Sequence, residues 1–153
     1  MKKLFSVILA VALVMSLSVT AFAANTTGGE ADITTSIAPT YTVTIPADVN
    51  VAFNATETDF GAIEVTASQI HPDKCIKVVL TTDGELNNAI DATKVIPYAI
   101  KDSEGTAFTS ATYLTEGDKT ELSIHITADD WNAAYAGEYS DTVTFTVSYE
   151  DKE

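Results

Sequence analysis

The chain has 153 residues, with 22 acidic and 8 basic side chains and a formal net charge of −14 at pH 7. It contains no arginine, and beyond residue 3 its lysines are scattered. Nucleic acids and anionic membrane surfaces are bound through clustered cationic side chains. The composition therefore argues against both as partners, and the length fits one domain.

The first 23 residues have the pattern of a cleaved signal peptide. Lys2 and Lys3 precede an apolar stretch at residues 4–17, and Ala21-Phe22-Ala23 provides small residues for cleavage. This stretch is shorter than the about 20 residues that a membrane-spanning helix needs. We therefore expect cleavage after Ala23 or Ala24, a secreted or extracellular protein associated with the cell surface, and no membrane insertion after signal removal.

Residues 24–39 predict a flexible N-terminal segment. They are small and mostly polar, and they include Gly28-Gly29. Ile33 and Ile37 alternate weakly with polar residues, so a short strand remains an alternative for residues 31–37.

Residues 40–151 predict a single β-sandwich domain. Short runs of alternating apolar and polar residues are separated by turn signals every ~8–12 residues, which is typical of antiparallel sandwiches. The most apolar run, residues 74–82, indicates a central and well-covered strand. The fold class that we expect is all-β: an immunoglobulin-like Greek-key sandwich of about seven to nine strands. The candidate runs are residues 40–45, 50–53, 61–67, 74–82, 95–101, 106–109, 113–114, 120–127 and 141–149, and residues 85–93 are ambiguous between a helical turn and a loop.

One short helical turn is predicted near residues 129–136, with Asp129 as a candidate N-cap and Gly137 at its end. Trp131 and Tyr135 are four residues apart and would share a face of this turn. They could form a hydrophobic plug at one end of the sandwich, or an aromatic platform that stacks a sugar. Tyr139 is a candidate for a tyrosine corner, in which the hydroxyl group bonds to nearby backbone.

The sequence shows no recognisable catalytic, cofactor or metal motif. His71 and His125 are expected at the surface. Cys75 is expected to be a half-buried small apolar residue, with a reactive thiol as the alternative. Two groups of oxygen-bearing side chains could be offered to Ca²⁺, but neither has the spacing of an ordered calcium loop. These groups are Asp129, Asp130 and Asn132, and Asn54, Glu57 and Asp59. We therefore expect no enzyme, no cofactor and no metal site.

The last run, residues 141–149, raises a question about its neighbours. Residues 142–147 (TVTFTV) contain no charge, proline or glycine, and such a strand is an aggregation hazard when its edge is bare. We therefore expect pairing on both sides, with Val143, Phe145 and Val147 in the core. The second neighbour could be the run at 40–45, the segment at 31–37, or a strand from another copy.

Three stretches, YTVTIPADV, IPYAI and AGEYSDTVTFTVSYE, resemble motifs of secreted bacterial immunoglobulin-like β-sandwich surface proteins. They are similar to spore coat protein U and fimbrial-subunit-like domains, over residues 41–150. The resemblance implies a non-enzymatic structural or adhesive subunit that acts through sheet-edge and loop contacts. Its partners would be other surface proteins or further copies of itself. The chain lacks the cysteine pair of several fimbrial relatives, which argues against pilus assembly. The alternative is a soluble carbohydrate-binding module that uses Trp131 and Tyr135 to bind glycans.

Overall fold

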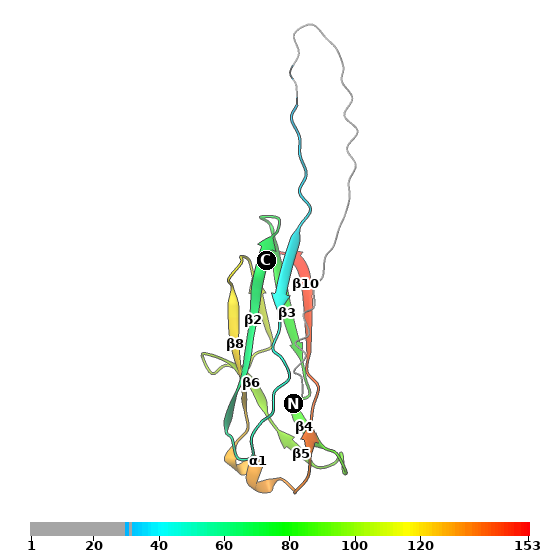
Figure 1. The fold of residues 1–153 in the computed structure, drawn as a ribbon, viewed down its shortest axis with the longest axis vertical. Coiled ribbons are helices and arrows are strands. Elements are labelled where there is room, and N and C mark those ends of the chain that lie inside the picture. Colours follow the sequence, from blue (N-terminus) through cyan, green and yellow to red (C-terminus); the bar gives the residue numbers. More distant parts are fainter. Residues whose placement is uncertain (1–29, 31) are drawn as a thin grey trace, which may run out of the picture.

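A computed structural model describes residue 30 and residues 32–153, so the predicted signal peptide and its cleavage site lie outside the described residues. The described part contains ten strands and one short helix, all in a single elongated body (Figure 1). In chain order the elements are β1 (Thr40–Thr44), β2 (Glu57–Gln69), β3 (Lys74–Thr81), β4 (Glu85–Asn88), β5 (Val95–Pro97), β6 (Ala99–Asp102), β7 (Ser110–Tyr113), β8 (Lys119–His125), α1 (Ala128–Ala133), β9 (Tyr139–Ser140) and β10 (Thr144–Asp151).

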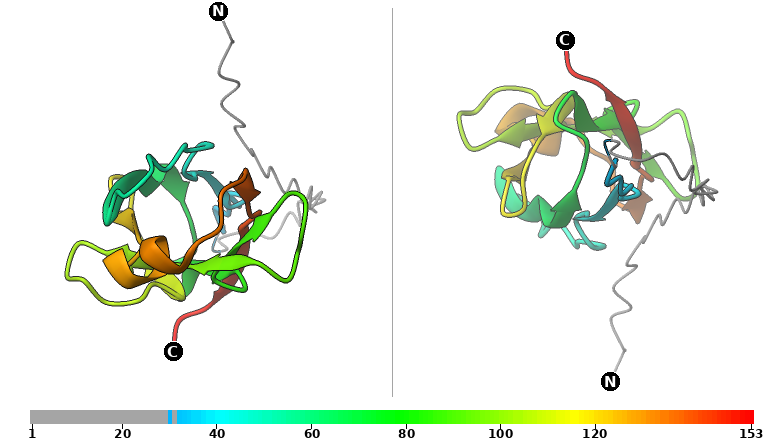
Figure 2. Two further views of the ribbon diagram at one scale, coloured as in Figure 1. Left: turned by 90° about the horizontal axis from the view of Figure 1, so that it is seen from below. Right: turned by 90° about the horizontal axis from the view of Figure 1, so that it is seen from above.

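The strands form three antiparallel sheets around a common interior (Figure 2). One sheet has the order β1-β2-β8-β6, a second has the order β10-β3-β7, and a third has the order β5-β4-β9. The all-β sandwich predicted from the alternating runs is therefore confirmed. Strand β3 lies in the centre of its sheet, as its continuous apolar sequence predicted.

The core forms because alternate side chains of facing strands point inward. Ile63 and Val65 of β2 and Ile76 and Val78 of β3 are completely buried. Each such side chain contributes roughly 1.5–3 kcal/mol by leaving water. Cys75 is also buried, with its thiol Sγ 3.8 Å from the carbonyl oxygen of Asp151. The expectation of a half-buried Cys75 underestimated its burial, because the end of β10 covers it.

The helix α1 is shorter than predicted and begins with a different cap. The side chain of Thr127, not that of Asp129, accepts a hydrogen bond from the backbone N–H of Asp130 at 3.1 Å. This bond satisfies one of the amide groups that lack a partner at a helix start. The helix ends at Ala133, since Ala134 has extended backbone angles, so Tyr135 lies outside it.

Two predicted strands are absent from the described structure. Residues 50–53 are coil, and residues 106–109 contribute only an isolated bridge between Ala107 and Lys101. The ambiguous residues 85–93 contain β4 and a turn, in which the Asn88 side chain accepts hydrogen bonds from the N–H groups of Ile90 and Asp91.

The prediction that the last strand pairs on both sides is wrong for the described part of the chain. Among the described strands, β10 pairs with β3 only, so no described strand covers its other edge. The nearest candidate, β1, is paired with β2 in the opposite layer, and only the side chains meet there: Tyr41 stacks on Tyr149 with ring centroids 5.8 Å apart. Val143 precedes the strand, while Phe145 and Val147 are half-buried against the core.

Candidate functional site

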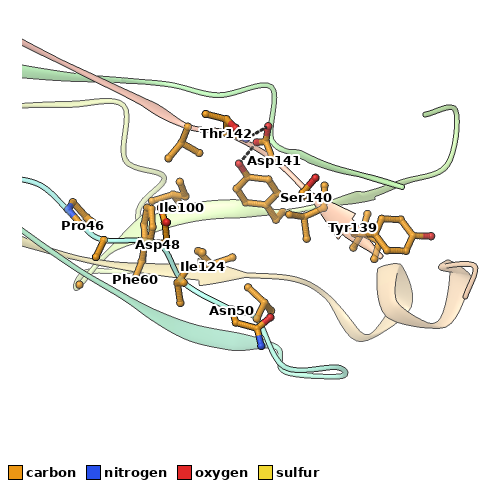
Figure 3. A pocket seen from close by; sticks show the side chains of 18 of the residues that line it. Pro46, Asp48, Asn50, Phe60, Ile100, Ile124, Tyr139, Ser140, Asp141 and Thr142 are labelled. Carbon is orange, nitrogen blue, oxygen red and sulfur yellow. Dashed lines mark hydrogen bonds between the residues drawn. The ribbon is translucent and has the colours of Figure 1, made fainter. Parts of the chain in front are cut away.

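An apolar groove of about 1270 Å³ opens between the β1-β2-β8-β6 sheet and the β10-β3-β7 sheet, on the side where β1 and β10 lie. One rim is the coil that follows β1, at residues 45–53, and the other is formed by β9 and the start of β10, at residues 139–145. Figure 3 shows Asp48 and Asn50 on the first rim and Asp141 and Thr142 on the second, with Phe60, Ile100 and Ile124 between them. The floor is therefore made of apolar core side chains, of which Ile100 and Ile124 are buried and Phe60 is half-buried.

The two rims differ from the paired strands because their backbones join no ladder, although the Thr142 N–H donates to the Asp141 carboxylate at 2.6 Å. Within the described residues, no backbone–backbone hydrogen bond involves residues 47–51 or residues 141–143. Pro46 explains the first rim, because proline has no N–H group to continue the β1 ladder. Buried backbone groups need partners, so an unpaired rim has to stay in contact with water or with another chain. The groove thus has an apolar floor and two rims without ladder partners, which are the features of a site where a further β-strand can be added.

A hydrogen-bonded group of three side chains fixes the second rim. The Tyr98 hydroxyl bonds to the Asp141 carboxylate and lies 2.7 Å from Thr82 Oγ1, which itself lies 3.3 Å from the same carboxylate. Burial of the ring, together with the hydrogen bond to Asp141, raises the pKa of Tyr98 well above its usual value. Tyr98 therefore stays a neutral donor, and the group ties Asp141 of the second rim to Tyr98 and Thr82.

An aromatic cluster lies at the end of the groove near α1. Trp131 is half-buried, and its indole Nε1 donates to the carbonyl oxygen of Ala55 at 2.8 Å. Phe53, which is 78% exposed, meets the Trp131 ring edge-on at 5.6 Å. Tyr135 is 64% exposed, and Lys94 Nζ lies 4.8 Å from the centre of its ring. Trp131 thus packs towards the core, while Tyr135 faces solvent.

Tyr139 makes the contact expected of a tyrosine corner. Its hydroxyl group donates to the carbonyl oxygen of Tyr135 at 2.9 Å, which ties the start of β9 to the segment after α1. This bond also fixes the lower end of the second rim, because Tyr139 lines the groove.

The remaining candidate residues take part in local bonding. His71 is exposed, and His125 is half-buried with Nε2 2.9 Å from Ser123 Oγ. Asp59 accepts from the Gly61 N–H at 2.9 Å, and Asp130 accepts from the Thr127 hydroxyl at 2.5 Å. Among the described side chains, no three of His, Cys, Asp and Glu gather as a metal site would require.

Sequence reasoning did not find the groove. It placed residues 50–53 in a strand and residues 141–143 in a strand that is paired on both sides. It therefore missed that Phe53, Tyr98 and Asp141 line one groove. One signal was available: Pro46, with Asn50 and Asn54 after it, argues for coil beside an otherwise apolar core.

Within residues 30 and 32–153, no helix is long and apolar enough to cross a membrane. Comparisons of the chain with protein-family models, with curated proteins and with solved structures give no significant match.

Proposed function

We propose that this protein is a secreted, non-enzymatic structural or adhesive subunit of the cell surface or extracellular space, and that it acts through sheet-edge and loop contacts. The observation that carries the proposal is the free edge of β10, which has no charged residue from Thr144 to Ser148. Natural sheet edges are normally blunted with lysine, proline or a covering segment. An edge left open and uncharged is suited to pairing with another chain, since main-chain hydrogen bonds supply affinity and alternate side chains supply selectivity.

The opposite edge of the same sheet provides the comparison. Strand β7 is the other edge strand, and it also carries exposed small polar residues, Ser110 and Thr112. Unlike β10, it spans only four residues, and short edge strands offer little to pair with. Of the two edges of this sheet, β10 therefore offers the longer strand for pairing.

The test places two lysines on each edge in turn. Thr144→Lys with Thr146→Lys charges the β10 edge, and Ser110→Lys with Thr112→Lys makes the same charge change on β7. All four side chains are exposed, so both variants should fold. We expect the β10 variant to move from cell-associated and cross-linkable assemblies to free monomer, while the β7 variant behaves like the wild type. Sedimentation velocity and the fraction retained on washed cells measure this, and equal behaviour of the two variants would contradict the proposal.

A second candidate function, carbohydrate binding, is favoured by one observation. Phe53 and Tyr135 expose aromatic rings at the α1 end of the molecule, and exposed rings can stack on sugars. We expect Tyr135→Ala and Phe53→Ala to abolish retention on polysaccharides in affinity electrophoresis if this function holds. Ile90→Ala, at a tip that is 92% exposed, is the control for loss of an exposed apolar side chain.

A further inference from the structure

Every second residue of β10 turns its backbone groups away from β3. In an antiparallel ladder the N–H and C=O groups of one residue point to the same side, and the side alternates along the strand. Leu80 of β3, which faces Phe145, donates its N–H to the carbonyl oxygen of Thr109, away from β10. The pair of Leu80 and Phe145 is therefore not hydrogen-bonded, and the Phe145 groups point outward. The outward groups of the strand thus belong to Phe145, Val147 and Tyr149.

The same three residues carry the apolar side chains of β10. Phe145 lies 6.1 Å from the Phe60 ring and Tyr149 lies 5.8 Å from the Tyr41 ring, and both of these partners belong to the opposite sheet. Val147 is half-buried against the core. A strand added at this edge would therefore bond to the backbone and pack against the apolar side chains of the same residues.

Residues 145–149 (FTVSY) have nearly the same pattern in both directions. An aromatic residue stands at each end, a hydroxyl residue comes next on each side, and Val147 is in the middle. A second copy that runs antiparallel, with Val147 opposite Val147, would place Phe145 opposite Tyr149 and Thr146 opposite Ser148. Aromatic pairs and hydroxyl pairs at facing positions stabilise antiparallel sheets. The β10 edge is therefore complementary to itself.

The charges at the end of β10 fit the same arrangement. Lys77 Nζ lies 3.4 Å from the Glu150 carboxylate, and Lys74 Nζ lies 2.6 Å from the Asp151 carboxylate. In the antiparallel arrangement Glu150 would face Thr144 of the second copy. In a parallel arrangement each Glu150 would face its own counterpart, and like charges at facing positions are destabilising. The charge pattern thus favours antiparallel copies.

We propose that β10 of two copies pairs antiparallel around a two-fold axis at Val147, so that the two β10-β3-β7 sheets join into one. The outward groups of the three residues would then exchange about six main-chain hydrogen bonds. This inference rests on the proposed function and names its partner, a second copy of the same chain. Both copies use the same edge, so assembly stops at two. The α1 ends of the dimer point in opposite directions, because the paired strands do (Figure 1).

Cysteine cross-linking tests the register. Copies with Thr146→Cys and copies with Ser148→Cys are mixed and then oxidised with copper–phenanthroline, while the native Cys75 stays in place because it is buried. Facing residues lie within disulfide range, whereas two copies of position 146 lie diagonally, about 7–8 Å apart. We expect the mixture to give at least about fivefold more covalent dimer than either variant alone. Equal yields from the mixture and the single variants overturn the proposal.

The β7 edge provides the matched control. Ser110→Cys and Thr112→Cys flank one residue of the other edge strand, as the first two substitutions do on β10. Their mixture should give no more covalent dimer than the wild type, which measures any reaction of Cys75. Equal cross-linking at the two edges would show random collision and would contradict the proposal.

Proline at the axis tests the main-chain bonds. The Val147 N–H points away from β3, so Val147→Pro removes a donor from the edge and leaves the β3 ladder intact. We expect the dimer Kd in sedimentation velocity to rise at least about tenfold. Val147→Ala keeps the N–H and should change the Kd by less than about fivefold. Equal Kd values for the two variants contradict the proposal, and Thr144→Lys with Thr146→Lys replaces the proline variant if thermal unfolding shows that it is not folded.

Sedimentation together with retention on washed cells separates this inference from the proposed function. If the wild type forms the dimer in this register but the β10 lysine variant stays on cells, the proposed function fails while the dimer stands. If the β10 lysines release the chain from cells but the wild type is monomeric at every concentration, the edge pairs with a different chain. That result overturns the dimer and leaves the proposed function standing. Wild-type species larger than two copies also overturn it.

Discussion

Single acidic side chains hold the tight turns of this sandwich. Asp102 accepts hydrogen bonds from the N–H groups of Glu104 and Thr106, and Asp118 accepts from those of Leu114 and Thr115. A carboxylate that accepts backbone N–H groups replaces the ladder partners that a turn lacks. Some of the acidic side chains of this chain are therefore used locally, within turns. This use is independent of any partner.

Asp118 gives a prediction at the scale of one residue. Hydrogen bonds from the N–H groups of Leu114 and Thr115, together with the Thr115 hydroxyl, lower the pKa of Asp118 below its ordinary value of 3.8. The folded state thus favours the ionised form, and this contribution to stability is present above pH 3.8 and is lost as pH falls through the lowered pKa. Asp118→Asn should destabilise the protein at neutral pH by about 1–2 kcal/mol.

Chemical denaturation at pH 7 and at pH 3 measures the effect. The difference between wild type and Asp118→Asn should shrink at the lower pH, because the wild-type carboxylate is then becoming protonated. Glu116→Gln removes a charge from the same turn and should change stability by less than about 0.5 kcal/mol. An Asp118→Asn effect that does not depend on pH would contradict this account of the carboxylate.

At the scale of elements, the paired strands β3 and β10 differ in the number of their neighbours and in the burial of their side chains. Strand β3 has neighbours on both sides and three completely or nearly buried side chains on its inner face, at Ile76, Val78 and Leu80. Strand β10 has one neighbour and keeps its apolar side chains half-buried. Stability is therefore concentrated in β3, whereas β10 has an edge available for contacts.

Truncation of a β3 side chain tests this distribution. Ile76→Ala leaves a cavity in a completely enclosed site and should cost about 2–5 kcal/mol of unfolding free energy. Ile90→Ala removes the same atoms from a side chain that is 92% exposed and should cost less than about 0.5 kcal/mol. The midpoints of urea unfolding give both values, and similar losses at the two positions would show that β3 is not the centre of the core.

At the scale of the whole molecule, the two ends of the sandwich have different surfaces. β1 begins at one end of the body, just after the exposed Ile33 and Ile37, and α1 lies at the other end (Figure 1), where Phe53 meets the half-buried Trp131. The net charge of −14 opposes nonspecific contacts between copies.

The amino-acid sequence alone determined the fold class and most of the strands. Alternation of apolar and polar residues is a local property, so it identified β1, β3 and β8 and the central position of β3. The bond made by Tyr139 was also predicted, because the residue lies a fixed few positions from its backbone partner. These features depend on residues that are close together in the chain, so the residue pattern of a short stretch is enough to predict them.

Only the tertiary structure decided which edges are paired and where the core is open. Whether β10 has a second neighbour depends on how β1 pairs with β2 in the other sheet, and β1 lies 100 residues before β10 in the chain. The alternation of residues 142–147 carries no information about that pairing. The groove likewise arises from two segments, residues 45–53 and 139–145, that meet only after the layers have packed. Pairing across layers is a long-range property, and the candidate site consists of the backbone that this packing left free.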